Sequence, residues 1–393
     1  MNAARQEEHM KILVTGAKGF VGRNLCAELY NIASGKRRVS PLNDTPEVLE
    51  YDIGSSEEEL REYCRTADFA VNLAGVNRPR DDSEFMRGNF GFADTLLGFL
   101  EECGNNCPVL MSSSIQAALD NPYGLSKRAG EERFFEHGRK TGAPVYVYRF
   151  PNVFGKWCRP NYNSAIATFC HNTAHGLPIK VNDPSVMMHL VYIDDVVEEI
   201  LRAIGGSPNW EGEYCRVPVQ YDRPLGEVAS AITGFAVQRK GLFIPEVSDP
   251  FIKKLYSAYL SYVPAEEAAV PCEMKRDERG SFTELLRTEG MGQVSVNVCR
   301  PGFTKGNHWH HTKAERFIVV SGSGVIRERR IGSGEVTEIP VSGDEISSVD
   351  MLPGYTHSIE NTGESDLVFM IWANERFDPE RPDTFFEKVL QED

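Results

Sequence analysis

Two groups of residues in this 393-residue chain have types and spacings that suit chemistry. The first combines a glycine-rich run, Gly16 to Gly22, with Tyr123 and Lys127, which lie four residues apart. On a helix, this spacing places both side chains on one face, so the ammonium lies near the phenol. A phenol has an unperturbed pKa of about 10, and a nearby cation lowers it toward the range useful for proton transfer.

The second group lies near the end of the chain and has the composition of a metal site: His308, His310, Glu315 and His357. On a β-strand, His308 and His310 would point to the same face and His311 would point away. Three imidazoles and one carboxylate suit zinc or another divalent metal, with an open position for substrate if one ligand is loose. A metal-free sugar site with hydrogen-bonding histidines is the alternative.

The elements around the first group alternate between strand-like and helix-like segments. Apolar runs at 11–15, 69–74, 108–111 and 145–148 predict strands, and 21–30 has helical spacing. This alternation indicates a parallel, doubly wound α/β sheet. A glycine-rich turn from strand to helix aims the helix N-terminus at the pyrophosphate of a dinucleotide.

The sequence changes in character from Gly280 onward. Short alternating runs at 294–298, 317–320 and 367–372 are punctuated by Gly and Pro, which is typical of an antiparallel β-barrel or sandwich. A helical segment at 248–262 precedes this region. We therefore predict two domains, an α/β domain over 10–264 and an all-β domain over 270–393.

Composition excludes several functional classes. The net charge of -15 disfavours nucleic acid as a partner. No apolar stretch approaches the length of a membrane span, and the polar N-terminus does not resemble a signal peptide. The nine cysteines follow no disulfide framework. These features predict a cytoplasmic protein.

Residues 10 to about 245 resemble an extended short-chain dehydrogenase/reductase of the sugar-nucleotide type. The resemblance rests on the glycine run and on the segments 72–75, 121–127, 149–155 and 191–196. It implies a Rossmann-type fold with Tyr123 as acid/base, Lys127 as its partner and ribose ligand, and Ser114 as the residue that orients the substrate oxygen. The cofactor-binding residues expected on this basis are Gly16, Lys18, Gly19, Phe20, Val21, Gly22, Asp52, Leu73, Ala74, Gly75, Tyr123 and Lys127.

Gln116 bears on the reaction type. Dehydratases of this family carry an Asp-Glu pair just after the equivalent hydroxyl residue, whereas here Ile115 and Gln116 follow Ser114. Without these carboxylates the site lacks the acid and base that expel water from the sugar. Simple reduction is therefore favoured.

The choice of cofactor depends on the end of the second strand. An acidic residue there would bind the ribose 2′-hydroxyl, whereas an arginine would attract the 2′-phosphate of NADPH. Asp52 is the candidate for the first role, and Arg37 or Arg38 for the second. The resemblance implies NADPH as the cofactor, and NADH is the alternative.

Residues 302–322 and 343–361 are similar to the two motifs of the cupin superfamily, a jelly-roll barrel. Taken together, the two halves resemble a family of bifunctional capsular-polysaccharide enzymes in which a reductase is fused to a cupin. That resemblance implies a UDP-linked 4-keto-6-deoxy-N-acetylhexosamine substrate and a homodimer. The cupin would epimerise C3 and the reductase would reduce C4, giving UDP-2-acetamido-2,6-dideoxy-L-talose on the route to UDP-N-acetyl-L-fucosamine. His311, Lys313 and Tyr355 are candidates for the base of the epimerase.

Two other hypotheses differ in class. The cupin could be a non-catalytic sugar-sensing or dimerisation module that serves the reductase, in which case the barrel would perform no chemistry. A two-histidine, one-carboxylate iron oxygenase would consume oxygen, and the fourth candidate ligand argues against it.

Overall fold

The computed structural model describes residues 9–37, 39–380 and 382–391. The chain forms two compact units. The first runs to Ile232 and includes Lys254–Val263, and the second consists of Thr233–Lys253 and the chain from Pro264 onward.

A seven-stranded sheet forms the centre of the first unit, with the strand order β2-β1-β3-β4-β5-β9-β8. Its strands are β1 (His9–Thr15), β2 (Thr45–Tyr51), β3 (Phe69–Asn72), β4 (Val109–Ser114), β5 (Val145–Phe150), β8 (Trp210–Glu211) and β9 (Tyr214–Cys215). All neighbouring strands are parallel except β8 and β9. The strand order reverses between β1 and β3, and such a switch point is where doubly wound sheets bind ligands.

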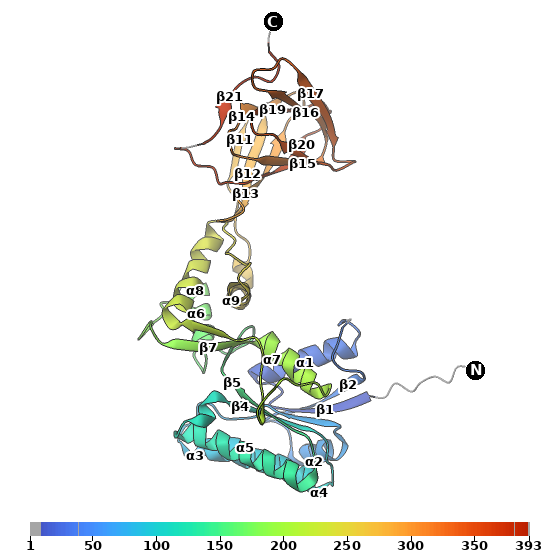
Figure 1. Ribbon diagram of the computed structural model, residues 1–393, viewed down its shortest axis with the longest axis vertical. Helices are drawn as coiled ribbons and strands as arrows, with labels where there is room; N and C mark the ends of the chain where they lie inside the picture. The colour runs from blue at the N-terminus through green and yellow to red at the C-terminus, as the bar shows by residue number, and fades with distance from the viewer. Residues whose placement is uncertain (1–8, 38, 381, 392–393) are drawn as a thin grey trace, which may run out of the picture. The chain divides into compact units, whose positions relative to one another are not determined.

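Helices cover both faces of this sheet, as Figure 1 shows, with α1 and α7 on one face and α2, α4 and α5 on the other. Their bounds are α1 (Phe20–Ala33), α2 (Glu57–Thr66), α4 (Phe92–Glu102), α5 (Pro122–Thr141) and α7 (Ile193–Ile204). Helix α5 begins at Pro122, where the side chain of Asn121 accepts a hydrogen bond from the amide of Gly124, and ends at the left-handed Gly142. This start places Tyr123 in the first turn of α5.

Shorter elements complete the first unit. A second sheet has the order β10-β7-β6. These elements are α3 (Ser83–Phe85), a π-helical turn (Met86–Gly91), a 3₁₀ turn (Ile115–Ala118), β6 (Asn152–Phe154), α6 (Ala165–Ala174), β7 (Met187–Tyr192) and β10 (Tyr221–Pro224). Helices α8 (Leu225–Lys240) and α9 (Pro250–Leu260) each have residues in both units.

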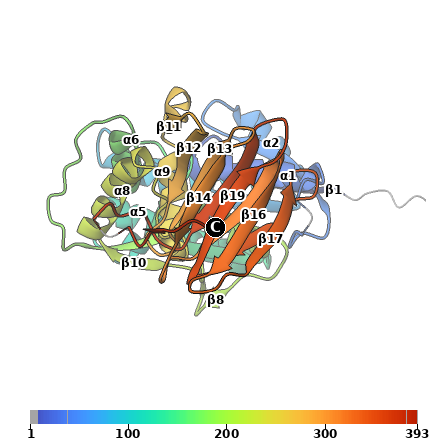
Figure 2. The same ribbon diagram turned by 90° about the horizontal axis from the view of Figure 1, so that it is seen from above.

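The second unit is built mainly of two antiparallel sheets, ordered β11-β12-β13-β20-β15-β18 and β17-β16-β19-β14-β21. Figure 2 shows β14, β19, β16 and β17 side by side. Phe317, Ile326 and Phe369 belong to the apolar core of this unit. The elements are a 3₁₀ turn (Ala265–Glu267), β11 (Met274–Asp277), β12 (Gly280–Arg287), β13 (Gln293–Cys299), β14 (Thr304–Trp309), β15 (Glu315–Ser321), β16 (Ser323–Arg330), β17 (Val336–Ser342), β18 (Ser348–Met351), β19 (Tyr355–Asn361), β20 (Leu367–Ala373) and β21 (Phe385–Phe386).

The predicted fold class is confirmed in both halves, and the differences concern local bounds. The strand expected over 69–74 ends at Asn72, because the chain leaves the sheet there to form a loop against the glycine-rich turn. The helix expected over 248–262 is α9, which begins at Pro250 and ends at Leu260. Within the described part of the chain, no helix is long and apolar enough to cross a membrane.

Candidate functional site

The glycine-rich turn between β1 and α1 makes a close approach to the loop after β3. Gly16 has a φ of +69°, and a Cβ built on it would lie 2.8 Å from the amide nitrogen of Ala74. A Cβ on Gly22 would lie 2.1 Å from the carbonyl oxygen of Gly16. Larger residues are therefore excluded at both positions, and the turn can bring backbone amides against a phosphate group.

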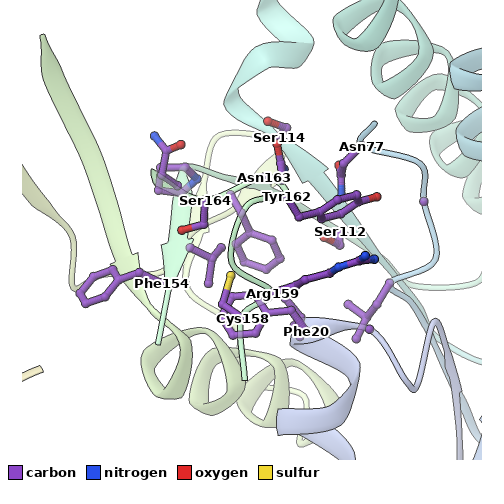
Figure 3. A pocket seen from close by; sticks show the side chains of 18 of the residues that line it. Phe20, Asn77, Ser112, Ser114, Phe154, Cys158, Arg159, Tyr162, Asn163 and Ser164 are labelled. Atoms are coloured by element: carbon purple, nitrogen blue, oxygen red, sulfur yellow. The ribbon is translucent and has the colours of Figure 1, made fainter. Parts of the chain in front are cut away.

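A pocket of about 940 Å³ opens beside this turn. Of the residues expected to bind cofactor, all but Asp52 and Ala74 line it: Gly16, Lys18, Gly19, Phe20, Val21, Gly22, Leu73, Gly75, Tyr123 and Lys127. The other half of its wall comes from β5, β6, β7 and the segment before α6, including Arg159, Tyr162 and Asn163. Figure 3 shows Asn77, Ser112 and Ser114 toward one end of the pocket and Phe154 toward the other. The size and polar lining suit a dinucleotide together with a second ligand.

Tyr123 and Lys127 lie together in this pocket, as their spacing predicts. The Lys127 Nζ lies 5.9 Å from the centre of the Tyr123 ring and donates a 3.0 Å hydrogen bond to the carbonyl oxygen of Ser112. Burial lowers the pKa of Lys127 to about 8, while the charge of Glu131 acts in the opposite direction. The ammonium is thus anchored to the end of β4 beside the phenol.

The ionisation of Tyr123 differs from the expectation. Burial raises the pKa of its phenol, and a hydrogen bond with Ser114 partly offsets that rise. The sequence predicts that the Lys127 ammonium lowers this pKa, but the effect of burial is larger and the shift is upward. Burial therefore favours the protonated form of Tyr123, which is the form that can donate a proton.

Asp52 immediately follows β2 and faces the glycine-rich turn. Its Oδ2 accepts a 2.7 Å hydrogen bond from the amide of Lys18. Arg37 is instead paired with Glu28 and Glu198, at 2.8 and 2.6 Å. Arg38 lies outside the described residues. The acidic candidate is therefore the one that lies at the cofactor turn.

Two buried side chains that the sequence did not single out hold this site together. Asn89, in the π-helical turn, accepts a 2.8 Å hydrogen bond from the amide of Val76 and donates one of 2.9 Å to Ser126. Glu131 accepts hydrogen bonds from Ser113 and Arg149. Neither residue belongs to a recognisable sequence motif. Only Glu131 could have been suspected from the sequence, because it lies one helical turn after Lys127.

The four residues expected to bind a metal come together in the second unit, with one ligand atom from each within 4.8 Å of the others. His308 on β14 pairs with His357 on β19, and the register of β14 shifts between Gly306 and His308. His310 follows the end of β14, and Glu315 is the first residue of β15. Glu315 Oε2 lies 3.5 Å from His310 Nε2 and 3.6 Å from His357 Nε2.

The chemistry of this cluster fits a cation. His310 Nε2 and both ring nitrogens of His357 are buried without a hydrogen-bond partner. Burial lowers the pKa of His308 to about 4, with the neighbouring His357 adding to the effect, so its imidazole is neutral. Burial opposes ionisation of Glu315, yet contacts with His310 and His357 hold its pKa well below the usual value. Three imidazoles beside a carboxylate suit zinc or another divalent metal.

A pocket of about 880 Å³ in the barrel reaches this cluster and is lined by Glu315 and Lys313. Lys313 is buried, and its Nζ lies 3.0 Å from Glu315 Oε1. His311 is exposed, makes edge-to-face contacts with the rings of Trp309 and Phe385, and is not part of the four-residue cluster. Among the three candidates for the base, only Lys313 lines this pocket within the described part of the chain.

The fold and pocket define the first unit as a dinucleotide-binding α/β unit of the reductase and epimerase class, joined to an antiparallel β-barrel. The chain belongs to the NAD dependent epimerase/dehydratase family, whose model matches residues 12–209. Residues 275–385 match the polysaccharide biosynthesis C-terminal domain. The expected reductase resemblance is thus confirmed.

Relatives match over nearly the whole chain. The UDP-2-acetamido-2,6-beta-L-arabino-hexul-4-ose reductase of Pseudomonas aeruginosa is 44% identical over 376 residues, which cover 96% of this chain and 98% of that protein. The crystal structure of the capsular polysaccharide assembling protein CapF from Staphylococcus aureus is 48% identical with a TM-score of 0.89, covering 97% of this chain and 100% of that one. A CapF structure with the inhibitor 3-isopropenyl-tropolone is 43% identical, with a TM-score of 0.84 and the same coverage. The chain is therefore homologous to these proteins over nearly all of their length.

Proposed function

We propose that this chain is a bifunctional UDP-sugar enzyme of capsular polysaccharide synthesis. Its substrate is a UDP-2-acetamido-2,6-dideoxy-hexos-4-ulose. The barrel inverts C3, and the first unit reduces C4 to give UDP-2-acetamido-2,6-dideoxy-L-talose on the route to UDP-N-acetyl-L-fucosamine. The observation that carries the proposal is the grouping of Ser114, Tyr123 and Lys127 around the glycine-lined pocket. The relative named as a reductase of a related 4-keto sugar supports it.

The reduction uses the protonated phenol of Tyr123. A nicotinamide cofactor, when bound, supplies the hydride that forms the new C4–H bond. As the C4 carbonyl becomes an alkoxide, Tyr123 donates its proton to that oxygen, leaving a phenolate near the Lys127 ammonium. Ser114 lines the same pocket, and its hydroxyl orients the same oxygen by a hydrogen bond. Substrate gains one hydride and one proton, which balances the two-electron reduction.

The inversion at C3 uses the acidity of a carbon beside a ketone. A zinc or similar ion held by His308, His310, Glu315 and His357 would supply an electrophile for the C4 oxygen. Lys313, the base candidate that lines the barrel pocket, would take the C3 proton on its neutral amine, and the electron pair of the broken C3–H bond would move onto the C4 oxygen as an enolate. Water on the opposite face would supply the proton that returns to C3. Reprotonation from the opposite face then gives the inverted centre, which reduction at C4 fixes.

We propose NADH as the preferred cofactor, although the resemblance implied NADPH. The Asp52 carboxylate lies 2.7 Å from the Lys18 amide at the end of β2, where the adenosine ribose of a dinucleotide binds in this fold. A carboxylate there can accept hydrogen bonds from both ribose hydroxyls and repels a 2′-phosphate. Ile53, the next residue, is fully exposed and offers an apolar surface beside that position.

Product analysis tests the proposal as a whole. Full-length protein is incubated with UDP-2-acetamido-2,6-dideoxy-hexos-4-ulose and NADH, and the product is characterised by NMR. Oxidation of one NADH per sugar, with inverted C3 and a reduced C4, is expected. A product reduced at C4 that keeps the original configuration at C3 would rule out the epimerase step. Turnover without net NADH oxidation would rule out the reductase step. We also propose that the protein is a homodimer, as the resemblance implies, and sedimentation of the same sample tests this.

A further inference from the structure

The C-terminal segment 382–389 runs along the edge of the barrel, and we call it the C-terminal strap. Its β21 residues pair with β14, with Phe386 opposite His308 and Phe385 opposite Trp309. The side chain of Arg329, which is 1% exposed, donates hydrogen bonds to the carbonyl oxygens of Lys388 and Val389. The strap is thus attached to the strand that carries the first metal-ligand candidate.

Asp383 in this strap holds the loop between His310 and Glu315. Its Oδ1 accepts a 3.0 Å hydrogen bond from the amide of His311. Its Oδ2 accepts 2.9 Å hydrogen bonds from the amides of Thr312 and Lys313. One carboxylate therefore receives three successive backbone amides, which fixes the path of the loop between two ligand candidates.

The backbone of Asp383 makes a second contact with the cluster. His310 Nδ1 lies 2.6 Å from the carbonyl oxygen of Asp383, and a carbonyl can only accept, so Nδ1 carries the proton. In the neutral tautomer that can bind a metal, the other ring nitrogen, Nε2, carries the lone pair, and it lies 3.5 Å from Glu315 Oε2. Histidines that bind metals commonly donate their second N–H to such an acceptor, which fixes the tautomer and the ring orientation.

The conformation of Asp383 is unusual for a residue with a side chain. Its φ is +38°, in the left-handed region that costs energy for residues other than glycine. This conformational energy is offset by the three amide hydrogen bonds to the carboxylate and by the contact of the carbonyl oxygen with His310. The same residue therefore holds both the loop and the ring.

We propose that Asp383 is a positioning residue of the metal centre. Its carboxylate fixes the 311–313 amides and its carbonyl fixes the His310 tautomer, so that His310, Lys313 and Glu315 keep their places as one unit. This inference rests on the proposed metal site in the barrel. It adds a residue 73 positions away in sequence from the histidine that it orients.

Zinc affinity of the full-length protein tests this role. Asp383→Asn leaves only one good acceptor for three amides, and Asp383→Gly removes the carboxylate but tolerates the positive φ. Chelator competition should show Zn²⁺ binding weakened about 10–100-fold in both variants, the range found when partners of metal-binding histidines are lost. Asp344→Asn, the same change at an exposed aspartate, should bind Zn²⁺ like the wild type. The visible spectrum of the Co²⁺ form should also change in the Asp383 variants alone.

The outcomes separate the two proposals. Wild-type protein that binds no Zn²⁺ would remove the metal site itself. Wild-type protein that binds Zn²⁺ while Asp383→Gly binds equally well would overturn only the positioning role. Hydrogen exchange on the Zn²⁺-loaded wild type gives a test that does not depend on folding of a variant. The amides of His311, Thr312 and Lys313 should be protected, and rapid exchange of all three would also overturn the role.

Discussion

The Nζ of Lys127 donates a hydrogen bond to the carbonyl oxygen of Ser112 over 3.0 Å, and so joins helix α5 to the end of strand β4. This contact brings the helix that carries Tyr123 against the strand that carries Ser114. The phenol of Tyr123 and the hydroxyl of Ser114 both line the same pocket. The proton donor and the orienting group of the proposed reduction are therefore held by one junction.

Tyr123→Phe should reduce the rate of NADH oxidation with the 4-keto sugar by about 10²–10⁴-fold, because general acid catalysis contributes in that range. Affinity for NADH, measured by fluorescence titration, should be nearly unchanged. Tyr146→Phe removes a hydroxyl from β5 and serves as the matched control, with activity like the wild type. A Tyr123→Phe protein that oxidises NADH at the wild-type rate would rule out the assignment.

Asp52→Asn should reduce the preference for NADH over NADPH by about tenfold, since removal of a charge that faces a phosphate changes binding by roughly 1–2 kcal/mol at a partly exposed site. The measurement is kcat/KM for each cofactor at a fixed sugar concentration. Glu50→Gln, on the same strand, is the control and should keep the wild-type ratio. Wild-type protein that prefers NADPH would contradict the role given to Asp52.

His308→Ala and His357→Ala should each lower bound metal and lower the melting temperature of the barrel, because a ligand that binds only the folded state stabilises it. Metal content is measured by atomic absorption and melting by calorimetry. NADH binding to the first unit should persist. His311→Ala alters a histidine outside the cluster and should keep its metal. Unchanged metal content in both ligand variants would defeat the ligand set.

Glu101 gives the first unit a dependence on pH. Burial opposes its ionisation, but hydrogen bonds from Lys140, His137 and Arg133 outweigh it and lower the pKa from 4.5 to about 2. The depressed pKa means that the stabilisation is complete above about pH 4.5 and is lost as pH falls toward 2. Glu101→Gln should therefore lower the free energy of unfolding at neutral pH by about 1–3 kcal/mol and flatten its decline in that interval.

Urea titrations at several pH values measure this effect. Glu102→Gln alters the next residue, whose ion pair with Arg61 is more exposed, and should change stability by less than about 1 kcal/mol. If both variants lose the same free energy of unfolding, the buried contacts of Glu101 do not stabilise the fold more than an exposed ion pair does.

The predictable parts of this molecule are those set by nearby residues. The glycine run and the Tyr123–Lys127 pair depend on one turn and one helix, so their spacing was sufficient to place them in one pocket. The origin of Glu315 on a new strand and the contact of Asp383 with His310 depend on how distant strands pair, and spacing carries no such information. The pKa of Tyr123 depends on burial, which the helix pattern alone did not reveal.

Deuterium incorporation separates an epimerase from a sugar-sensing barrel. If the barrel forms an enolate from the 4-keto sugar, reprotonation in heavy water must place deuterium at C3 even when no nicotinamide is present. The full-length Tyr123→Phe protein should still catalyse this exchange, because loss of the C3 proton precedes the blocked reduction. His357→Ala should lose it, while His311→Ala should keep it, so the activity follows the metal cluster rather than the nucleotide pocket. Mass spectrometry and NMR of the recovered sugar measure the label. Metal-loaded, folded wild-type protein that shows no exchange above buffer would eliminate the epimerase role and leave the barrel as a binding or dimerisation unit.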